Sequence, residues 1–120
     1  MTAKVSTLAA RRALGPRRGQ VYWLEIPGIG RRPWLVVSAN GINLTAAVPH
    51  VIAARISTTV RERHLPTVVR LGPDEPIGGC VLAATVTQVR RDWFVEPAGV
   101  LTAATMRSVD HALGEALGLH

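Results

Sequence analysis

An arginine and a run of three hydroxyl residues are the side chains of this sequence best suited to chemistry. Arg32 stands directly before Pro33, and Ser57, Thr58 and Thr59 close an apolar segment. A guanidinium and a hydroxyl in one cleft suit phosphoryl transfer, in which the protein positions a phosphate and stabilises charge developing on its oxygens. The alternative is structural, because serine and threonine at strand ends commonly bond turn backbone and a loop arginine is commonly solvated.

Other kinds of site are not indicated. The lone cysteine, Cys80, offers no pair and its apolar neighbours predict an inert, buried thiol in a cytoplasmic protein. The glycines do not form a Walker phosphate loop. We therefore expect no metal and no cofactor. The histidines do not indicate a metal site, since they lack tight ligand spacing. They are His50, His64, His111 and His120.

The net charge of +6 indicates an anionic partner, but its distribution is uneven. Residues 1–18 contain five basic residues and no acid, which predicts a flexible basic tail ahead of a single domain at residues 19–120. A mitochondrial transit peptide has a similar composition and is the alternative for this tail. Residues 31–70 hold six arginines and one acid, so the cationic surface of the domain is local.

No segment predicts a membrane span. The apolar runs are far shorter than the roughly 20 residues that cross a bilayer, and the N-terminus lacks the apolar segment of a secretory signal. We expect a cytoplasmic protein.

Six strand-length segments dominate the chain from Gln20 onward. They are rich in β-branched and aromatic residues and are separated by glycine and proline turns, in one of which Asp74 and Glu75 predict a solvated corner. Pro33 fits the first position of its strand, with Arg32 held extended just before it. The predicted strands are residues 20–26, 33–39, 50–58, 67–71, 80–89 and 93–99.

The last segment changes to helical spacing. Thr102 is a plausible N-cap and Gly118 a terminator. The apolar stripe between them predicts core or dimer packing and consists of Met106, Val109, Leu113 and Leu117. The fold class is therefore mostly β (α+β), a small barrel of the SH3 or OB kind with one C-terminal helix. Such a fold does not itself dictate a function.

Five segments in this order resemble the MazF/PemK toxins of bacterial type II toxin–antitoxin modules. The resemblance covers residues 17–119 and includes Arg-Pro before the second strand and Leu-Pro-Thr after the hydroxyl cluster. The segments are "RRGQVYWLEI", "GRRPWLVVSANGIN", "VIAARISTTVRERHLPTVV", "CVLAATVTQVRRDW" and "LTAATMRSVDHALGEALGL".

The resemblance implies a dimeric SH3-like barrel that cleaves single-stranded RNA without metal, by attack of the ribose 2′-hydroxyl on the adjacent phosphate. The family's active-site arginine matches Arg32 and its hydroxyl residue matches Ser57, with Thr58 next in line. Arg32 would face the phosphate, and Ser57 would bond a non-bridging oxygen. The partners implied are single-stranded RNA, an acidic cognate antitoxin and a second copy of the chain.

The resemblance also implies an RNA-binding groove. The family segment that commonly reads Glu-Gln-Ile-Arg is Ala84–Thr87 here, which removes an acid and a base, and the "PGIGRR" loop is shorter than in many members. The expected RNA-binding residues are Arg31, Arg55, Arg61, Arg63, Thr85 and Thr87.

Three other functions remain open from the sequence. The first is a toxin of the same fold that acts on DNA gyrase by protein contact, as CcdB does, and that would need no pair of Arg32 and Ser57. The second is a catalytically silent RNA-binding barrel, which the changes at Ala84–Thr87 make credible. A structural dimerisation module is the third.

Overall fold

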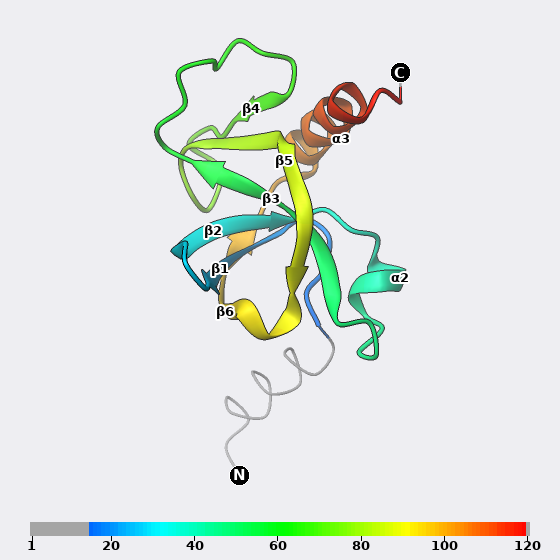
Figure 1. Ribbon diagram of the computed structural model, residues 1–120. Coiled ribbons are helices and arrows are strands. Elements are labelled where there is room, and N and C mark those ends of the chain that lie inside the picture. Colours follow the sequence, from blue (N-terminus) through cyan, green and yellow to red (C-terminus); the bar gives the residue numbers. More distant parts are fainter. Residues whose placement is uncertain (1–14, 120) are drawn as a thin grey trace.

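A six-stranded antiparallel sheet and one long helix make up the computed structural model, which describes residues 15–119 (Figure 1). The strands follow the order β4-β5-β3-β2-β1-β6 across the sheet. The mostly β (α+β) class and the C-terminal helix are confirmed. The elements are β1 (Gln20–Ile26), β2 (Gly30–Val36), α2 (Asn40–Asn43), β3 (His50–Ser57), β4 (Val68–Arg70), β5 (Cys80–Arg90), η1 (Arg91–Trp93), β6 (Phe94–Val100) and α3 (Ala103–Leu117).

The prediction that β2 starts at Pro33 is wrong, because the strand starts at Gly30 and Arg32 lies within it. Gly28 and Gly30 have φ values of 80° and 95°, which glycine adopts without steric cost, and they allow a tight hairpin from β1 into β2. Pairing of β2 with β3 begins only at Trp34. Pro33 is therefore tolerated because it lies where β2 has no β3 partner.

The short helix α2 was not predicted, since its Asn-Gly sequence is typical of a turn. Its stability depends on a residue distant in sequence. The Arg91 guanidinium donates hydrogen bonds to the carbonyl oxygens of Asn43 (2.7 Å), Ile42 (2.7 Å) and Thr45 (2.9 Å), which satisfies the carbonyls at the end of α2. No local sequence pattern predicts this contact.

Two apolar clusters lie on the two faces of the sheet, because successive strand side chains point to opposite sides. One contains Val21 and Leu35 and packs against Val109 and Ala112 of α3. Val109 is fully buried, and its burial contributes about 2 kcal/mol. The predicted α3 stripe thus packs on its own sheet, except that Leu117 is 57% exposed. The other cluster consists of Leu24, Ile26, Trp34, Val51, Ala53 and Val89.

The ends of α3 are as predicted. Thr102 Oγ1 accepts a hydrogen bond from the Thr105 N–H (3.2 Å), and Gly118 closes the helix at φ 70°. Cys80 is buried, in agreement with the prediction of an enclosed thiol. None of the helices within residues 15–119 is long and apolar enough to cross a bilayer.

Most of the predicted basic tail, residues 1–14, lies outside the described residues. Arg18 belongs to the folded part, because its Nε donates to the Val37 carbonyl (2.9 Å) and its guanidinium pairs with Asp110 of α3 (2.6 Å). The boundary between tail and domain at residue 18 stays a prediction.

Candidate active site

The β1–β2 hairpin and the end of β3 carry the two predicted catalytic groups. Trp34 pairs with Arg55 in the β2–β3 ladder. Two residues further along each strand come Arg32 and Ser57, so the continued register places them opposite each other and on the same side of the sheet. The ladder itself stops at Trp34, which leaves the two strands separated at this point.

A cleft of about 660 Å³ occupies this region. It brings together five of the predicted site residues, which are Arg31, Arg32, Arg55, Ser57 and Thr58. Its lining contains three guanidiniums and three hydroxyls and no carboxylate. The residues that line it are Trp23, Arg31, Arg32, Pro33, Arg55, Ile56, Ser57, Thr58, Thr59, Ile77 and Gly78.

The two neighbouring arginines of β2 have different surroundings. The Arg31 guanidinium forms an ion pair with Glu96 of β6 and lies 5.4 Å from the centre of the Trp23 ring. Arg32 is exposed, and its guanidinium donates to the Arg31 carbonyl (2.9 Å). Within residues 15–119 no carboxylate pairs with Arg32. Its charge is thus available to an anion in the cleft.

Ser57 is half-buried and its hydroxyl has a structural contact. Ser57 Oγ accepts a hydrogen bond from the Thr59 N–H (3.2 Å) and lies 3.3 Å from Thr59 Oγ1. This is the turn chemistry that the structural alternative predicts. It uses an oxygen lone pair and leaves the hydroxyl proton able to point to Thr59 or to an anion. Thr58 follows on the chain and is exposed.

The wall beside Ser57 comes from the loop between β4 and β5, which contributes Ile77 and Gly78 to the cleft. Gly79 has φ 106°, and a Cβ there would lie 2.7 Å from the Ser57 carbonyl oxygen. Only glycine fits this backbone conformation and this close approach. The loop therefore packs directly on the segment that carries the hydroxyl.

Glu75 holds the same loop against α3. The sequence predicted a solvated corner here, so this contact was not expected. Its carboxylate accepts hydrogen bonds from Thr102 N–H (3.0 Å), Thr102 Oγ1 (2.6 Å) and Thr105 Oγ1 (2.7 Å). Partial burial raises the pKa of Glu75, but the hydrogen bonds from Thr102 and Thr105 outweigh it, and the net pKa is lowered. An acid at this helix start is also favoured by the helix dipole. The sequence carried no signal for this contact, because Glu75 lies 27 residues before Thr102.

The remaining predicted RNA-binding residues are more dispersed. Strand β5 bulges away from β3 at one point. Four β5 residues, Ala83–Val86, lie opposite the single β3 residue Ala54. Thr85 fills this bulge, because its Oγ1 accepts from the Arg55 N–H (3.0 Å) and donates to the Leu82 carbonyl (2.7 Å). Arg61 and Thr87 are exposed and do not line the cleft, and Arg63 lies on a separate groove.

A second pocket of about 380 Å³ adjoins the cleft and shares Arg55, Ser57 and Thr59 with it. Leu65, Leu82 and Thr85 are among its other lining residues. No three potential metal-ligating side chains (His, Cys, Asp or Glu) gather anywhere in residues 15–119.

Residues 17–117 match the family of PemK-like, MazF-like toxins of type II toxin–antitoxin systems. The chain belongs to this family. It is 41% identical over 104 residues to endoribonuclease MazF4 of Mycobacterium tuberculosis, an alignment that covers 87% of this chain and 94% of the relative. It is 33% identical over 102 residues to the probable endoribonuclease MazF5 of the same organism, covering 82% and 89%.

Solved structures of MazF-like proteins share this fold. An endoribonuclease in complex with its cognate antitoxin from a mycobacterial species superposes with a TM-score of 0.79 at 41% identity, covering 88% of this chain and 97% of that one. MazE–MazF from Deinococcus radiodurans gives a TM-score of 0.73 at 27% identity, covering 87% and 96%.

Proposed function

We propose that this MazF-like chain is the toxin of a type II toxin–antitoxin module and acts as an endoribonuclease on single-stranded RNA. The observation that carries the proposal is the placement of Arg32 opposite Ser57 across a cationic cleft. Family membership and relatives named endoribonuclease support the same activity.

In the proposed reaction, the scissile phosphate lies between Arg32 and Ser57. The 2′-hydroxyl oxygen of the preceding ribose attacks phosphorus and the bond to the 5′-oxygen breaks, giving a 2′,3′-cyclic phosphate and a 5′-hydroxyl. The 2′-hydroxyl proton passes to water, and the leaving oxygen takes a proton from water. Arg32 stabilises charge on the non-bridging oxygens rather than moving a proton, since a guanidinium does not give up its proton in proteins. Ser57 donates its hydroxyl proton to one of those oxygens, with Thr58 beside it.

The proposed partners follow the same reasoning. The solved complexes contain a cognate antitoxin with a MazF-type chain. We propose that an acidic antitoxin neutralises this chain, that the chain forms a homodimer and that it acts in the cytoplasm. Sedimentation at micromolar concentration tests the dimer, and a monomer under those conditions would remove it.

The activity is tested with purified protein, a long unstructured transcript and EDTA. We expect discrete cuts without added metal, 2′,3′-cyclic phosphate ends, and no cleavage of a chimeric substrate with 2′-deoxyribose before the cut. Arg90→Ala serves as a control, because Arg90 is exposed and pairs with Asp92 away from the cleft. Cleavage that needs a divalent ion, or that leaves 3′-hydroxyl ends, would contradict the mechanism. RNA binding without cleavage would favour the silent barrel, and growth arrest without cleavage the gyrase poison.

A further inference from the structure

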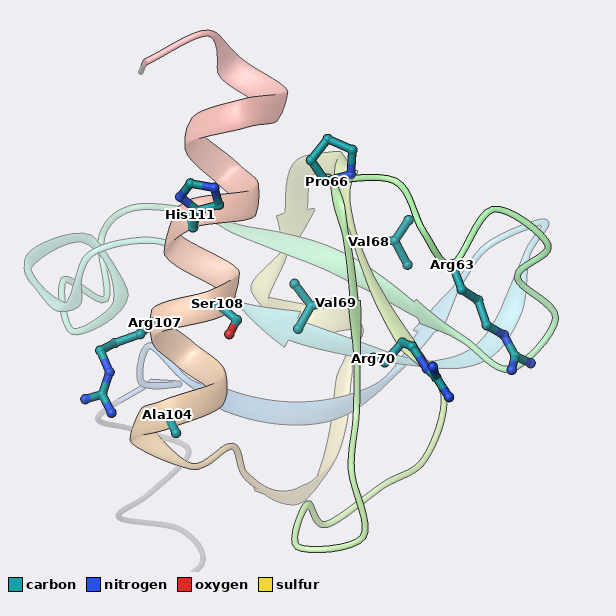
Figure 2. A pocket seen from close by; sticks show the side chains of 9 residues that line it. All are labelled: Arg63, Pro66, Val68, Val69, Arg70, Ala104, Arg107, Ser108 and His111. Atoms are coloured by element: carbon teal, nitrogen blue, oxygen red, sulfur yellow. The ribbon is translucent and has the colours of Figure 1, made fainter.

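The loop between β4 and β5, residues 71–79, forms one wall of the active cleft through Ile77 and Gly78. It starts from a strand that already lies beside α3, because Val69 of β4 and Ser108 of α3 line the two sides of one groove (Figure 2). Further along, the loop returns to the start of α3. The position of the cleft wall therefore depends on where α3 holds this loop.

Two neighbouring contacts fix the middle of the loop. The Glu75 carboxylate accepts hydrogen bonds from Thr102 Oγ1 (2.6 Å) and Thr105 Oγ1 (2.7 Å) at the first turn of α3. The next residue, Pro76, packs on Gly99 of β6, where an added Cβ would lie 2.4 Å from the Pro76 Cβ. Both contacts come directly before the loop residues that line the cleft.

Ser57 depends on this side of the sheet for its position. The β2–β3 ladder stops at Trp34 and Arg55, so β2 gives Ser57 no ladder hydrogen bond. On the β5 side, Ser57 pairs with Cys80. Gly79, the last residue of the loop, packs so closely there that an added Cβ would lie 2.7 Å from the Ser57 carbonyl oxygen. A shift of the loop is thus passed to the backbone that carries the hydroxyl.

An alternative role for Glu75 is purely structural. Its carboxylate also accepts a hydrogen bond from the Thr102 N–H (3.0 Å), as a helix cap does. However, Thr102 caps α3 with its own hydroxyl, which accepts from the Thr105 N–H (3.2 Å). Glu75 comes from the loop that forms the cleft wall and not from the segment that enters the helix. This placement favours a role that connects α3 to the cleft.

We infer that Glu75 is a positioning residue for RNA cleavage, which ties the cleft wall to the first turn of α3 and keeps the Ser57 hydroxyl opposite Arg32. The inference rests on the proposed function. Glu75 lies outside the cleft lining and acts through the loop. A misplacement of about 1 Å at the reacting groups slows a reaction by up to about 100-fold. Substrate binding is spread over the whole cleft and changes much less.

Single-turnover cleavage at saturating protein and neutral pH tests the inference. Glu75→Ala should slow cleavage by about tenfold or more, while the Kd for an uncleavable 2′-deoxy oligonucleotide stays within about twofold of wild type. Glu75→Gln keeps an oxygen acceptor for both threonine hydroxyls and should recover most of the rate. Asp74→Ala is the matched control, because Asp74 is exposed in the same loop, and it should cleave as wild type.

Thr105→Val tests the helix side of the same contact. It removes the hydroxyl donor and keeps the shape of the side chain, and it should slow cleavage by about threefold. The double variant Glu75→Ala/Thr105→Val should be no slower than Glu75→Ala alone, because the two changes break one contact.

Val51→Ala separates positioning from stability. Val51 is fully buried in the cluster on the other face of the sheet, at the opposite end of β3 from Ser57. The variant should unfold at a lower temperature than wild type and still cleave at the wild-type rate while folded. Circular dichroism and thermal unfolding establish that each variant is folded at the assay temperature.

Hydrogen exchange measures the Ser57 segment without RNA. The Thr59 N–H donates to Ser57 Oγ (3.2 Å). Exchange of this amide should rise by about tenfold in Glu75→Ala and stay unchanged in Asp74→Ala. If the wild-type protein cleaves no RNA, the proposed function fails, and this measurement decides by itself whether Glu75 places Ser57.

Three results would overturn the inference. The first is a folded Glu75→Ala variant with the wild-type cleavage rate or with unchanged exchange of the Thr59 amide. The second is a loss of rate that Val51→Ala reproduces, which would assign Glu75 to stability alone. The third is a loss of oligonucleotide affinity as large as the loss of rate, which would make the loop a binding element.

Discussion

Arg32 and Ser57 occupy matching register positions on two neighbouring antiparallel strands, two residues beyond the Trp34–Arg55 pair and on either side of one cleft. Pro33 lies where the ladder between these strands is interrupted. A continuous ladder would close the strands together and fill the space with backbone contacts. The interrupted ladder instead leaves a guanidinium and a hydroxyl facing a common space that suits a phosphate.

Single substitutions test which hydroxyl, that of Ser57 or that of Thr58, acts on the phosphate. Ser57→Ala should slow cleavage by about tenfold to 100-fold with little change in RNA affinity, because it removes a donor to the developing charge. Ser57→Thr should retain substantial activity because the hydroxyl remains. The measurement is single-turnover cleavage alongside equilibrium binding of an uncleavable oligonucleotide. If Thr58→Ala abolishes turnover while Ser57→Ala is silent, the hydroxyl role belongs to Thr58.

Gly79→Ala should disturb the site from outside the cleft. Its φ of 106° and the 2.7 Å distance that would separate the new methyl carbon from the Ser57 carbonyl oxygen require the backbone to move. We expect the free energy of unfolding to fall by about 1–3 kcal/mol and cleavage to slow, as the Ser57 segment is displaced. Gly72→Ala is the control, because no atom lies within 4 Å of a Cβ there. Equal stability of the two variants would show that this contact is unimportant.

Glu75 predicts a pH-dependent contribution to stability. Because its pKa is lowered in the folded state, its contribution is present above the ordinary carboxyl pKa and is lost as the pH falls through the lower folded value. Glu75→Gln should therefore lower the free energy of unfolding by about 1 kcal/mol near pH 7, allowing for solvent screening, and by much less near pH 3. Urea unfolding at both pH values measures this.

The neighbouring change Asp74→Asn provides the matched control, since Asp74 is exposed and lies next to Glu75 in the same loop. It should leave unfolding at pH 7 nearly unchanged. A Glu75→Gln variant with the same destabilisation at pH 7 and pH 3 would show that the carboxylate charge is not what holds the loop to α3.

Removal of residues 2–14 should weaken RNA binding without moving the cuts. The segment contains Lys4, Arg11 and Arg12 and no acid. Loss of up to three phosphate contacts should reduce the slope of log affinity against log salt by up to about 2 for a single strand. The deletion stops short of Arg18 because that residue pairs with Asp110. A changed cleavage pattern after the deletion would contradict a purely electrostatic role.

The sequence predicted the features that depend on local chemistry. Periodicity located all six strands, and the caps Thr102 and Gly118 bounded α3. The resemblance to a toxin family then selected Arg32 and Ser57 from many arginines and hydroxyls, a choice that composition alone left open.

Features that depend on distant partners were missed. The helix α2 needs Arg91 from nearly fifty residues away, and the loop beside Ser57 needs Thr102 and Thr105 to hold Glu75. The bulge at Thr85 depends on how many β5 residues face Ala54. Such contacts follow from strand register and loop packing, which a hydropathy pattern does not specify.

The most direct test of the proposed site is the single-turnover cleavage rate of Arg32→Ala in EDTA, measured at saturating protein on an RNA with one mapped cut. We expect a loss of at least about 100-fold, because the transition state loses its main charged donor, and little recovery in Arg32→Lys, which lacks the planar fork. Arg90→Ala should cleave at the wild-type rate. A folded Arg32→Ala variant that cleaves at the same site and rate as wild type would contradict the assignment of the active site to this cleft.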